Sequence, residues 1–169
     1  SSDLIDPADL DDTAMKLGIG AVKYADLRQN RVSDYVFDWD KMISFQGNAG
    51  PYMQNAYVRC RSIFRKGEVD PDQLTGAVTL ATEEEQTLGR LVARFGDVVH
   101  QAAETSQPNY LCEHLFETSK AFSRFYEACS VLNAEDEGTR QSRLRLTALV
   151  SRQLGRGLTL LGIDVVERM

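Results

Sequence analysis

The chain has 169 residues, 43% of them hydrophobic, and a formal net charge of −6. This composition is enough for one domain with a sizeable core and excludes an intrinsically disordered chain. No apolar run approaches the roughly 18 residues of a membrane helix, and the acidic start SSDLIDPADLDD differs from a basic signal peptide. We therefore expect a cytoplasmic protein without a membrane partner. The chain begins with Ser instead of Met, so we expect a fragment or a processed product.

The spacing of the cysteines and histidines argues against a metal site. Cys60, Cys112 and Cys129 form no CxxC pair, and the two histidines are His100 and His114. A zinc site needs closer ligand spacing. We expect three buried cysteines in a reducing compartment and no bound metal.

The first 50 residues predict short helical segments and loops. Asp6 and Pro7 suit a helix start, and that helix is expected to reach Lys16, where Gly18 and Gly20 interrupt it. AVKYADLRQN then resumes a helical pattern, RVSDYVF is expected to be an extended loop, and DWDKMISF a short helix before the turn QGNAG.

The chain from residue 51 onward predicts four long helices. The first covers 51–66, and the linker KGEVDPDQLTG follows it. Thr82 and Glu85 form a capping box that opens a helix to about Ala103. TSQP begins the third long helix, and the last covers about 139–161 and ends at Gly162. Because no segment alternates with period two, the sequence predicts an all-α antiparallel bundle of four to five main helices, with residues 1–169 as a single domain.

Helix 51–66 has two distinct faces at about 100° per residue. The core face holds Met53, Ala56, Tyr57, Cys60, Ile63 and Phe64. The outer face holds Tyr52, Asn55, Arg59, Ser62 and Lys66. This outer face suits a solvated surface with one amphipathic tyrosine. It also suits an RNA-binding face, where tyrosine stacks on an unpaired base and cations contact phosphates.

The last helix carries a second group of cations. Five arginines and no acid lie between Arg140 and Arg156. Arg145, Arg152 and Arg156 cluster away from the apolar stripe, with Leu149 between them. An acidic protein can still bind a polyanion when its cations converge on one surface. Since the sequence has no phosphate-binding loop or nucleophile elbow, it predicts a helical binding module rather than an enzyme, and no catalytic residues.

Three segments together carry a family resemblance: GIGAVKYADLRQNR, DYVFDWDKMISFQGNAGPYMQNAYVRCRSIFRK and the ending LGIDVVERM. They resemble the C-terminal region of arginyl-tRNA synthetases over essentially the whole chain. The resemblance implies an all-helical anticodon-binding domain that is appended to a class I catalytic domain with a Rossmann-type fold. It implies a parent ligase that joins arginine to tRNA-Arg using ATP and Mg²⁺, both bound by the catalytic domain. The two adenylate-forming motifs of that domain do not occur here, so no cofactor and no ligase activity are expected of this chain alone.

The resemblance also implies anticodon contacts at particular residues. They are Asn48 in the glycine-containing turn, Tyr52 after the proline, Tyr126 in SRFYEACSVL and the terminal Met169. The family's usual Q-Y-A-Y is Q-N-A-Y here, so Asn55 replaces a tyrosine that contacts the anticodon loop in relatives. The expected RNA-binding set is completed by Arg59, Lys66, Arg145, Arg152 and Arg156, which would share one face.

The implied partners are tRNA-Arg and the catalytic domain of the same polypeptide, with no DNA and with a monomeric protein. Trp39 and Phe45 are expected to be packing residues. Two alternatives stay open: the anticodon domain of another class I synthetase, such as the cysteinyl or methionyl enzyme, and a free-standing helical interaction module.

Overall fold

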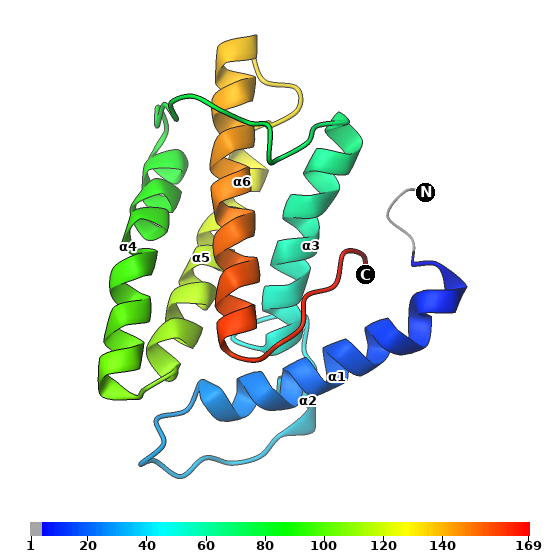
Figure 1. The fold of residues 1–169 in the computed structure, drawn as a ribbon, viewed down its shortest axis with the longest axis vertical. Helices are drawn as coiled ribbons and strands as arrows, with labels where there is room; N and C mark the ends of the chain where they lie inside the picture. Colours follow the sequence, from blue (N-terminus) through cyan, green and yellow to red (C-terminus); the bar gives the residue numbers. More distant parts are fainter. Residues whose placement is uncertain (1–4) are drawn as a thin grey trace.

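The computed structural model describes residues 5–169, and every regular element in that part of the chain is helical (Figure 1). After a short 3-10 turn, Pro7–Asp9, come six α-helices: α1 Leu10–Leu27, α2 Trp39–Met42, α3 Gly50–Gly67, α4 Glu83–Thr105, α5 Asn109–Ala128 and α6 Glu137–Leu160. The all-α prediction is confirmed. None of the described helices combines the length and the apolar character that crossing a membrane requires.

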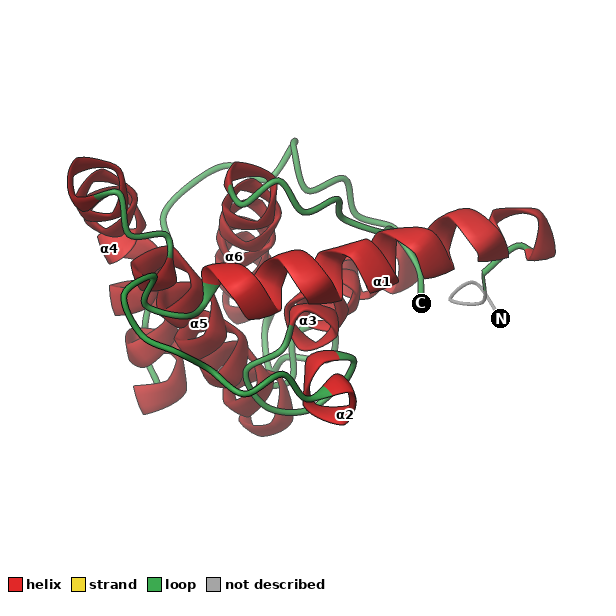
Figure 2. Ribbon diagram, turned by 90° about the horizontal axis from the view of Figure 1, so that it is seen from below, coloured by secondary structure: helices red, strands yellow, loops and turns green. Residues whose placement is uncertain are grey.

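Helices α3 to α6 form a four-helix bundle in which successive helices alternate in direction (Figure 1). Helix α4 packs most extensively against α5, and α3 packs against α6 and α5. Helix α1 lies across one end of the bundle and packs mainly on α3 (Figure 2). The bundle of four long helices with a fifth, crossing helix matches the architecture that the sequence predicts.

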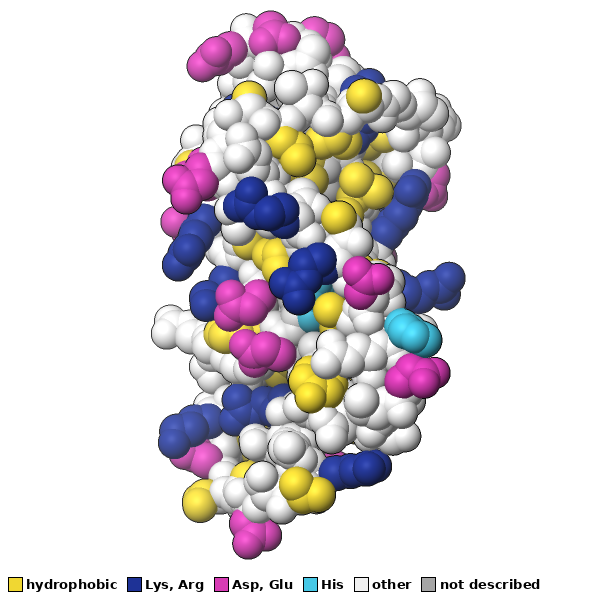
Figure 3. Space-filling view, turned by 90° about the vertical axis from the view of Figure 1, so that its left-hand side faces the viewer, with side chains coloured by type: hydrophobic (Ala, Val, Ile, Leu, Met, Phe, Trp, Pro, Cys, Tyr) yellow, Lys and Arg dark blue, Asp and Glu magenta, His cyan; other side chains and the backbone are white. Residues whose placement is uncertain are grey.

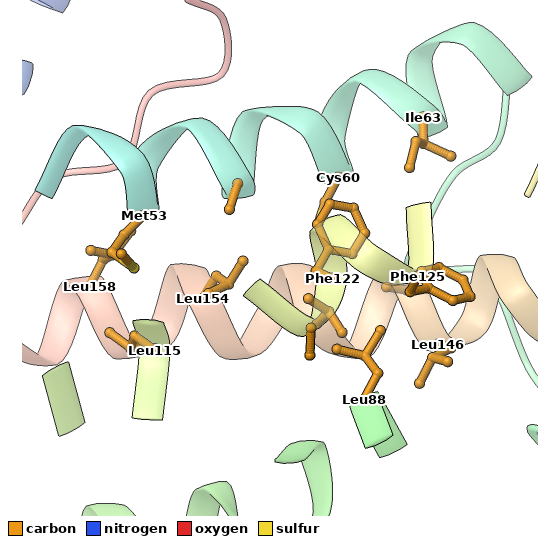
Figure 4. Close-up of a cluster of buried hydrophobic side chains, with 14 of the residues drawn as sticks. Met53, Cys60, Ile63, Leu88, Leu115, Phe122, Phe125, Leu146, Leu154 and Leu158 are labelled. Carbon is orange, nitrogen blue, oxygen red and sulfur yellow. The ribbon is translucent and has the colours of Figure 1, made fainter. Parts of the chain in front are cut away.

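The core is built from the apolar faces that the helical periodicity predicts. Cys60 and Ile63 of α3 lie toward Phe122 and Phe125 of α5, and Met53 of α3 lies beside Leu158 of α6 (Figure 4). The other sides of this core are closed by Leu88 of α4 and by Leu146, Leu154 and Leu158 of α6. Each fully buried side chain of this size contributes about 1.5–3 kcal/mol. All three cysteines are buried and free, as expected.

The expected helix start at Thr82 is confirmed. The hydroxyl of Thr82 accepts a hydrogen bond from the amide of Glu85 at 3.2 Å, and the Glu85 carboxylate accepts one from the amide of Thr82 at 3.0 Å. Asp38 caps the short helix α2 by accepting a hydrogen bond from the amide of Lys41 at 3.2 Å. Gly162 follows α6 with φ of +69°, a conformation that favours glycine.

The predicted interruption of the first helix is wrong, because α1 runs without a break from Leu10 to Leu27. Gly20 permits a close approach between helices instead. A Cβ atom on Gly20 would lie 3.1 Å from the side-chain nitrogen Nε2 of Gln54. A Cβ atom on Gly50 would lie 2.8 Å from the backbone carbonyl oxygen of Gly20. Gly18 has no neighbouring atom within 4 Å of such a Cβ position, so it is a tolerated helix residue.

Trp39 and Phe45 are not buried in the core, contrary to the expectation that they are packing residues. Their exposed fractions are 59% and 54%. Both lie in the stretch that links α1 to α3, which has few neighbours in the bundle. The bulk of an aromatic side chain favours burial, but it does not specify which partner covers it.

The C-terminal tail after α6 folds back over α3. Ile163 and Val166 are buried. The carboxylate of Glu167 accepts hydrogen bonds from Tyr57 at 3.0 Å and from Arg61 at 2.9 Å. These contacts fix the tail, so that its last residue, Met169, is half-buried.

Candidate RNA-binding surfaces

Two helices bring aromatic and cationic side chains together on one side of the bundle. The guanidinium carbon of Arg59 lies 4.9 Å from the ring centroid of Tyr126, within the range of a cation–π contact. The same guanidinium donates a hydrogen bond to the Ser123 hydroxyl at 3.2 Å. We define the α3–α5 surface as Tyr52, Asn55 and Arg59 of α3 with Tyr126 of α5.

The two tyrosines of the α3–α5 surface differ in how much ring they offer. Tyr126 is 42% exposed. Its ring packs on Phe122, with centroids 6.1 Å apart. Tyr52 is half-buried and meets the Phe116 ring edge-on, with centroids 6.0 Å apart. Both rings are therefore held in place while part of each stays accessible, as a stacking platform for an unpaired base requires.

Phe116 and Ser123 are supports that the sequence interpretation did not single out. Both lie on α5 and order the side chains of Tyr52 and Arg59. They are seven residues apart on α5, and Tyr126 follows Ser123 by three residues. The signal that could have identified them is this helical spacing, which places them on one stripe facing α3.

Asn48 is tied into the protein. The buried hydroxyl of Tyr24 lies 2.7 Å from the Asn48 side-chain oxygen and 2.9 Å from the Cys112 carbonyl oxygen, and its single proton is donated to one of the two at a time. Arg28 donates to the Asn48 carbonyl at 2.9 Å. Asn48 is therefore first a support of the 46–50 turn that precedes Tyr52.

The arginines of α6 do not form the free row that the sequence suggests. Arg145 is half-buried and donates to the Ala77 carbonyl at 2.9 Å, which holds the linker between α3 and α4. Arg152 pairs with Asp72 at 3.1 Å. Arg156 is exposed and has no hydrogen bond or ion pair within the described part of the chain.

The other two α6 arginines are also paired. Arg140 pairs with Glu137 at 3.2 Å. Arg143 pairs with Glu85 at 2.7 Å, with only 14% and 3% of the two side chains exposed. Most of the positive charge on α6 thus holds the bundle and its linker together.

The α3 and α6 cations lie on different sides of the bundle, so the expected single face is corrected to two surfaces. Arg152 and Arg156 border a shallow groove that Tyr57, Phe95 and Leu149 help to line. Tyr57 and Arg59 are two residues apart on α3, so their side chains point about 160–200° apart. On the α4 side of the molecule, Lys and Arg side chains are interspersed with Asp and Glu (Figure 3).

The remaining two candidates lie near the ends of their segments. Lys66 is exposed in the last turn of α3, and Met169 ends the tail that folds back over the same helix.

Burial raises the pKa of three side chains in this part of the bundle. Burial, together with the hydrogen bond to Glu167, raises the pKa of Tyr57 to about 12. Burial raises the pKa of the Cys112 thiol to about 12 and also raises that of Cys60. No group of three or more His, Cys, Asp or Glu in the described residues is arranged to hold a metal ion. The arrangement suits binding.

Comparisons with known proteins show the family of this chain. Residues 53–169, more than two thirds of the chain, match the family model described as the DALR anticodon binding domain. Residues 2–39 match the model described as the catalytic domain of class I tRNA synthetases (R). Residues 40–52 separate the two matched stretches, and both stretches lie within the 1–169 segment that the sequence interpretation treats as one domain.

Curated relatives are similar over most of this chain. The arginine–tRNA ligase of Haemophilus ducreyi is 51% identical over 153 residues, which is 90% of this chain and 27% of that protein. The arginine–tRNA ligase of Edwardsiella ictaluri is 50% identical over 153 residues, which is 90% of this chain and 26% of that protein. The chain thus spans about a quarter of the length of these relatives.

Solved structures show the same fold. The arginyl-tRNA synthetase of Thermus thermophilus superposes on the whole chain with a TM-score of 0.87 and 30% identity, over 29% of its own length. The enzyme of Plasmodium falciparum superposes over 95% of this chain and 28% of its own, with a TM-score of 0.86 and 31% identity. The chain therefore belongs to the DALR anticodon-binding domain family, in the form found in arginyl-tRNA synthetases.

Proposed function

We propose that this chain binds the anticodon stem-loop of tRNA-Arg as part of an arginine–tRNA ligase that charges this tRNA using ATP in the cytoplasm. The observation that carries the proposal is the contact of Arg59 with the Tyr126 ring, on the side of the bundle where Tyr52 is also accessible. The family and the relatives support the same proposal.

On the α3–α5 surface, base recognition and phosphate contact are made by neighbouring groups. The exposed part of the Tyr126 ring offers a face to an unstacked base, and Arg59 adds positive charge beside it. Asn55, half-buried one turn before Arg59, offers an amide to a base edge in place of the family's tyrosine. Lys66 extends the cationic side toward the end of α3. Met169 supplies an apolar contact from the tail.

In this proposal ATP and Mg²⁺ are bound by the rest of the ligase, and the protein acts as a monomer. The helical chain 1–169 behaves as one unit. Although residues 2–39 match the catalytic-domain model, α1 packs on α3 through the close approach of Gly20 and Gly50. The side-chain amide of Gln54 of α3 lies 3.5 Å from the Lys16 carbonyl oxygen of α1 and donates to the Asp164 carbonyl of the tail at 2.9 Å, so it connects α3 to both segments.

The test is aminoacylation by the full-length ligase of tRNA-Arg and of tRNA-Arg substituted at the middle anticodon base. Tyr126→Ala and Tyr52→Ala should each lower kcat/KM by an amount that corresponds to about 1–3 kcal/mol, the range measured for base stacking on an aromatic ring. Deleting Met169 should reduce discrimination against the substituted tRNA.

The control is Leu149→Ala, which changes an exposed side chain in the α6 groove. It should leave charging unchanged. If all three variants of the proposed site discriminate like the wild type, the anticodon is read elsewhere. Charging of tRNA-Cys or tRNA-Met in place of tRNA-Arg would assign the chain to another class I synthetase, and no tRNA binding at all would leave a helical interaction module.

A further inference from the structure

Exposed hydrophobic side chains are concentrated in one part of the chain. Of the sixteen large hydrophobic residues that are exposed in the described part, eleven lie in residues 10–45. That stretch is less than a quarter of the described residues. Val36 is 92% exposed and Val32 is 83% exposed. Single exposed hydrophobic residues are normal on a protein surface, but a concentration of this kind marks an interface.

Helix α1 has two apolar faces, and only one of them is covered. Tyr24 and Ala21 are buried against the bundle. Met15, Ile19 and Val22 are 63%, 47% and 45% exposed. Their spacing of four and three residues places these three in one stripe, about 180° around the helix from Tyr24. The exposed stripe therefore points directly away from α3.

The loop after α1 adds aromatic side chains at the same end of the bundle. Phe37 and Trp39 pack edge to face, with centroids 5.1 Å apart at an interplanar angle of 89°. They remain 51% and 59% exposed. Helix α1, this loop and α2 lie at the end nearest the viewer in Figure 2. We call the α1 stripe together with residues 32–45 the end surface.

The sequence of the end surface indicates what covers it. Residues 2–39 match the family model of the class I catalytic domain. The curated relatives carry most of their length outside the region that this chain matches, which is 26% of the Edwardsiella ictaluri protein. This segment belongs by sequence to the catalytic domain, yet its exposed apolar side chains point away from the bundle. They therefore suit a contact with the rest of the catalytic domain.

We propose that the end surface is the docking face for the catalytic domain of the same polypeptide. This inference rests on the proposed function, because it requires a parent ligase. Covalent linkage holds the two parts at a high effective concentration, so an interface of modest size is sufficient. Docking places the catalytic domain directly on α1, whose Tyr24 holds the 46–50 turn next to the α3–α5 surface.

RNA is a poor occupant of this surface. Asp11 and Asp26 are exposed and lie within about 40° of the α1 stripe on the helical wheel, at its two ends. Carboxylates at those positions repel phosphates, whereas they suit the polar rim of a protein–protein interface.

The experiment uses trypsin on the full-length ligase. Arg28 and Arg31 lie where α1 ends and the loop begins, so a docked catalytic domain should shield them. Wild-type enzyme should be cut slowly there. Ile19→Glu/Val22→Glu should be cut at these sites on the order of tenfold faster, because charge in the interface favours the open form that trypsin cleaves. The matched control, Leu149→Glu/Leu160→Glu, replaces side chains of comparable exposure, 38% and 54%, and should be cut like wild type.

Three other outcomes decide against the docking proposal. Rapid cleavage of the wild type at Arg28 and Arg31 would show an uncovered surface, even if the variant failed to fold. Unchanged cleavage with weaker tRNA binding would assign the surface to RNA. A wild-type dimer that the variant dissociates in sedimentation would assign it to a second copy. Aminoacylation of tRNA-Arg by the wild type is measured in parallel, and its absence would overturn the proposed function, not the docking result.

Discussion

At the residue scale, the hydroxyl of Tyr24 is the most consequential polar group outside the helix backbones. It is fully buried between the Asn48 side chain and the Cys112 carbonyl. Tyr24→Phe should cost about 1–2 kcal/mol of unfolding free energy, since a buried acceptor loses its donor. Urea denaturation measures this loss. The control is Tyr57→Phe, whose hydroxyl binds the exposed Glu167, and it should cost less than about 1 kcal/mol. Equal losses would mean that Tyr24 only fills space.

The pair of Glu85 and Arg143 should give the protein part of its acid sensitivity. Burial acts to raise the pKa of Glu85, but hydrogen bonds from Arg143 and from the amides of Thr82 and Ala81 lower the pKa overall. A carboxylate whose pKa is lower in the folded state contributes stability above its unfolded value of about 4.5, and that stability is lost as pH falls through the folded value.

Glu85→Gln should therefore cost about 3 kcal/mol at neutral pH, because it leaves a buried arginine without its counter-charge. Gln still accepts in the capping box, so the helix start is preserved. The difference from wild type should shrink as pH falls below about 4.5, as measured by urea midpoints across a pH series. Glu137→Gln, in an exposed pair with Arg140, should change stability far less than Glu85→Gln. A difference that is independent of pH would contradict the ion-pair account.

At the scale of elements, a glycine inside the α1–α3 contact and a glycine outside it should respond oppositely to the same substitution. Gly50→Ala places a Cβ atom 2.8 Å from the backbone carbonyl of Gly20, and backbone cannot move aside cheaply. It should cost about 1–3 kcal/mol. Gly18→Ala meets no atom within 4 Å inside helix α1 and should gain about 0.5–1 kcal/mol. Thermal unfolding distinguishes the two, and a stabilising Gly50→Ala would show that α1 and α3 are not closely packed.

The elements show how far a sequence alone can lead. The helices from Gly50 onward follow from apolar periodicity and from the Thr82 capping box, which are local signals. The predicted break in helix α1 is wrong because a glycine destabilises a helix by only about 1 kcal/mol relative to alanine. The packing of α1 on α3 outweighs this cost. Trp39 was misjudged because its partner is not set by local sequence.

The same distinction separates the predictable part of the candidate site from the rest. The outer face of α3 could be predicted, since Tyr52 and Arg59 share one side of a regular helix. The pairings of Arg145 with Ala77 and of Arg152 with Asp72 could not, because both partners lie in an irregular linker far away in the chain. Helical periodicity places residues on faces, but it does not say which charges are already neutralised.

At the scale of the whole molecule, the net charge of −6 and the pairing of the α6 arginines restrict where a polyanion can bind. Asp72 forms an ion pair with Arg152, and Glu85 forms one with Arg143. The α3–α5 surface instead presents Arg59 against an aromatic ring and a hydroxyl. Long-range repulsion from the acidic remainder should then suppress non-specific RNA binding, while the local surface selects its ligand.

Salt dependence of tRNA binding should therefore distinguish the two cationic surfaces. Each phosphate contact releases counterions, so removing one lowers the slope of log K against log salt by about 1. Arg59→Gln/Lys66→Gln should weaken binding of tRNA-Arg and lower the slope by about 2. Arg152→Gln/Arg156→Gln removes the same formal charge from the groove on the other side of the bundle. At every salt concentration, it should weaken tRNA binding less than Arg59→Gln/Lys66→Gln does. Filter binding of the full-length ligase across a salt series measures both. If the α6 pair lowers the slope and the α3 pair does not, the RNA lies along the groove that contains Tyr57 and Phe95, and the α3–α5 surface is only a packed aromatic face.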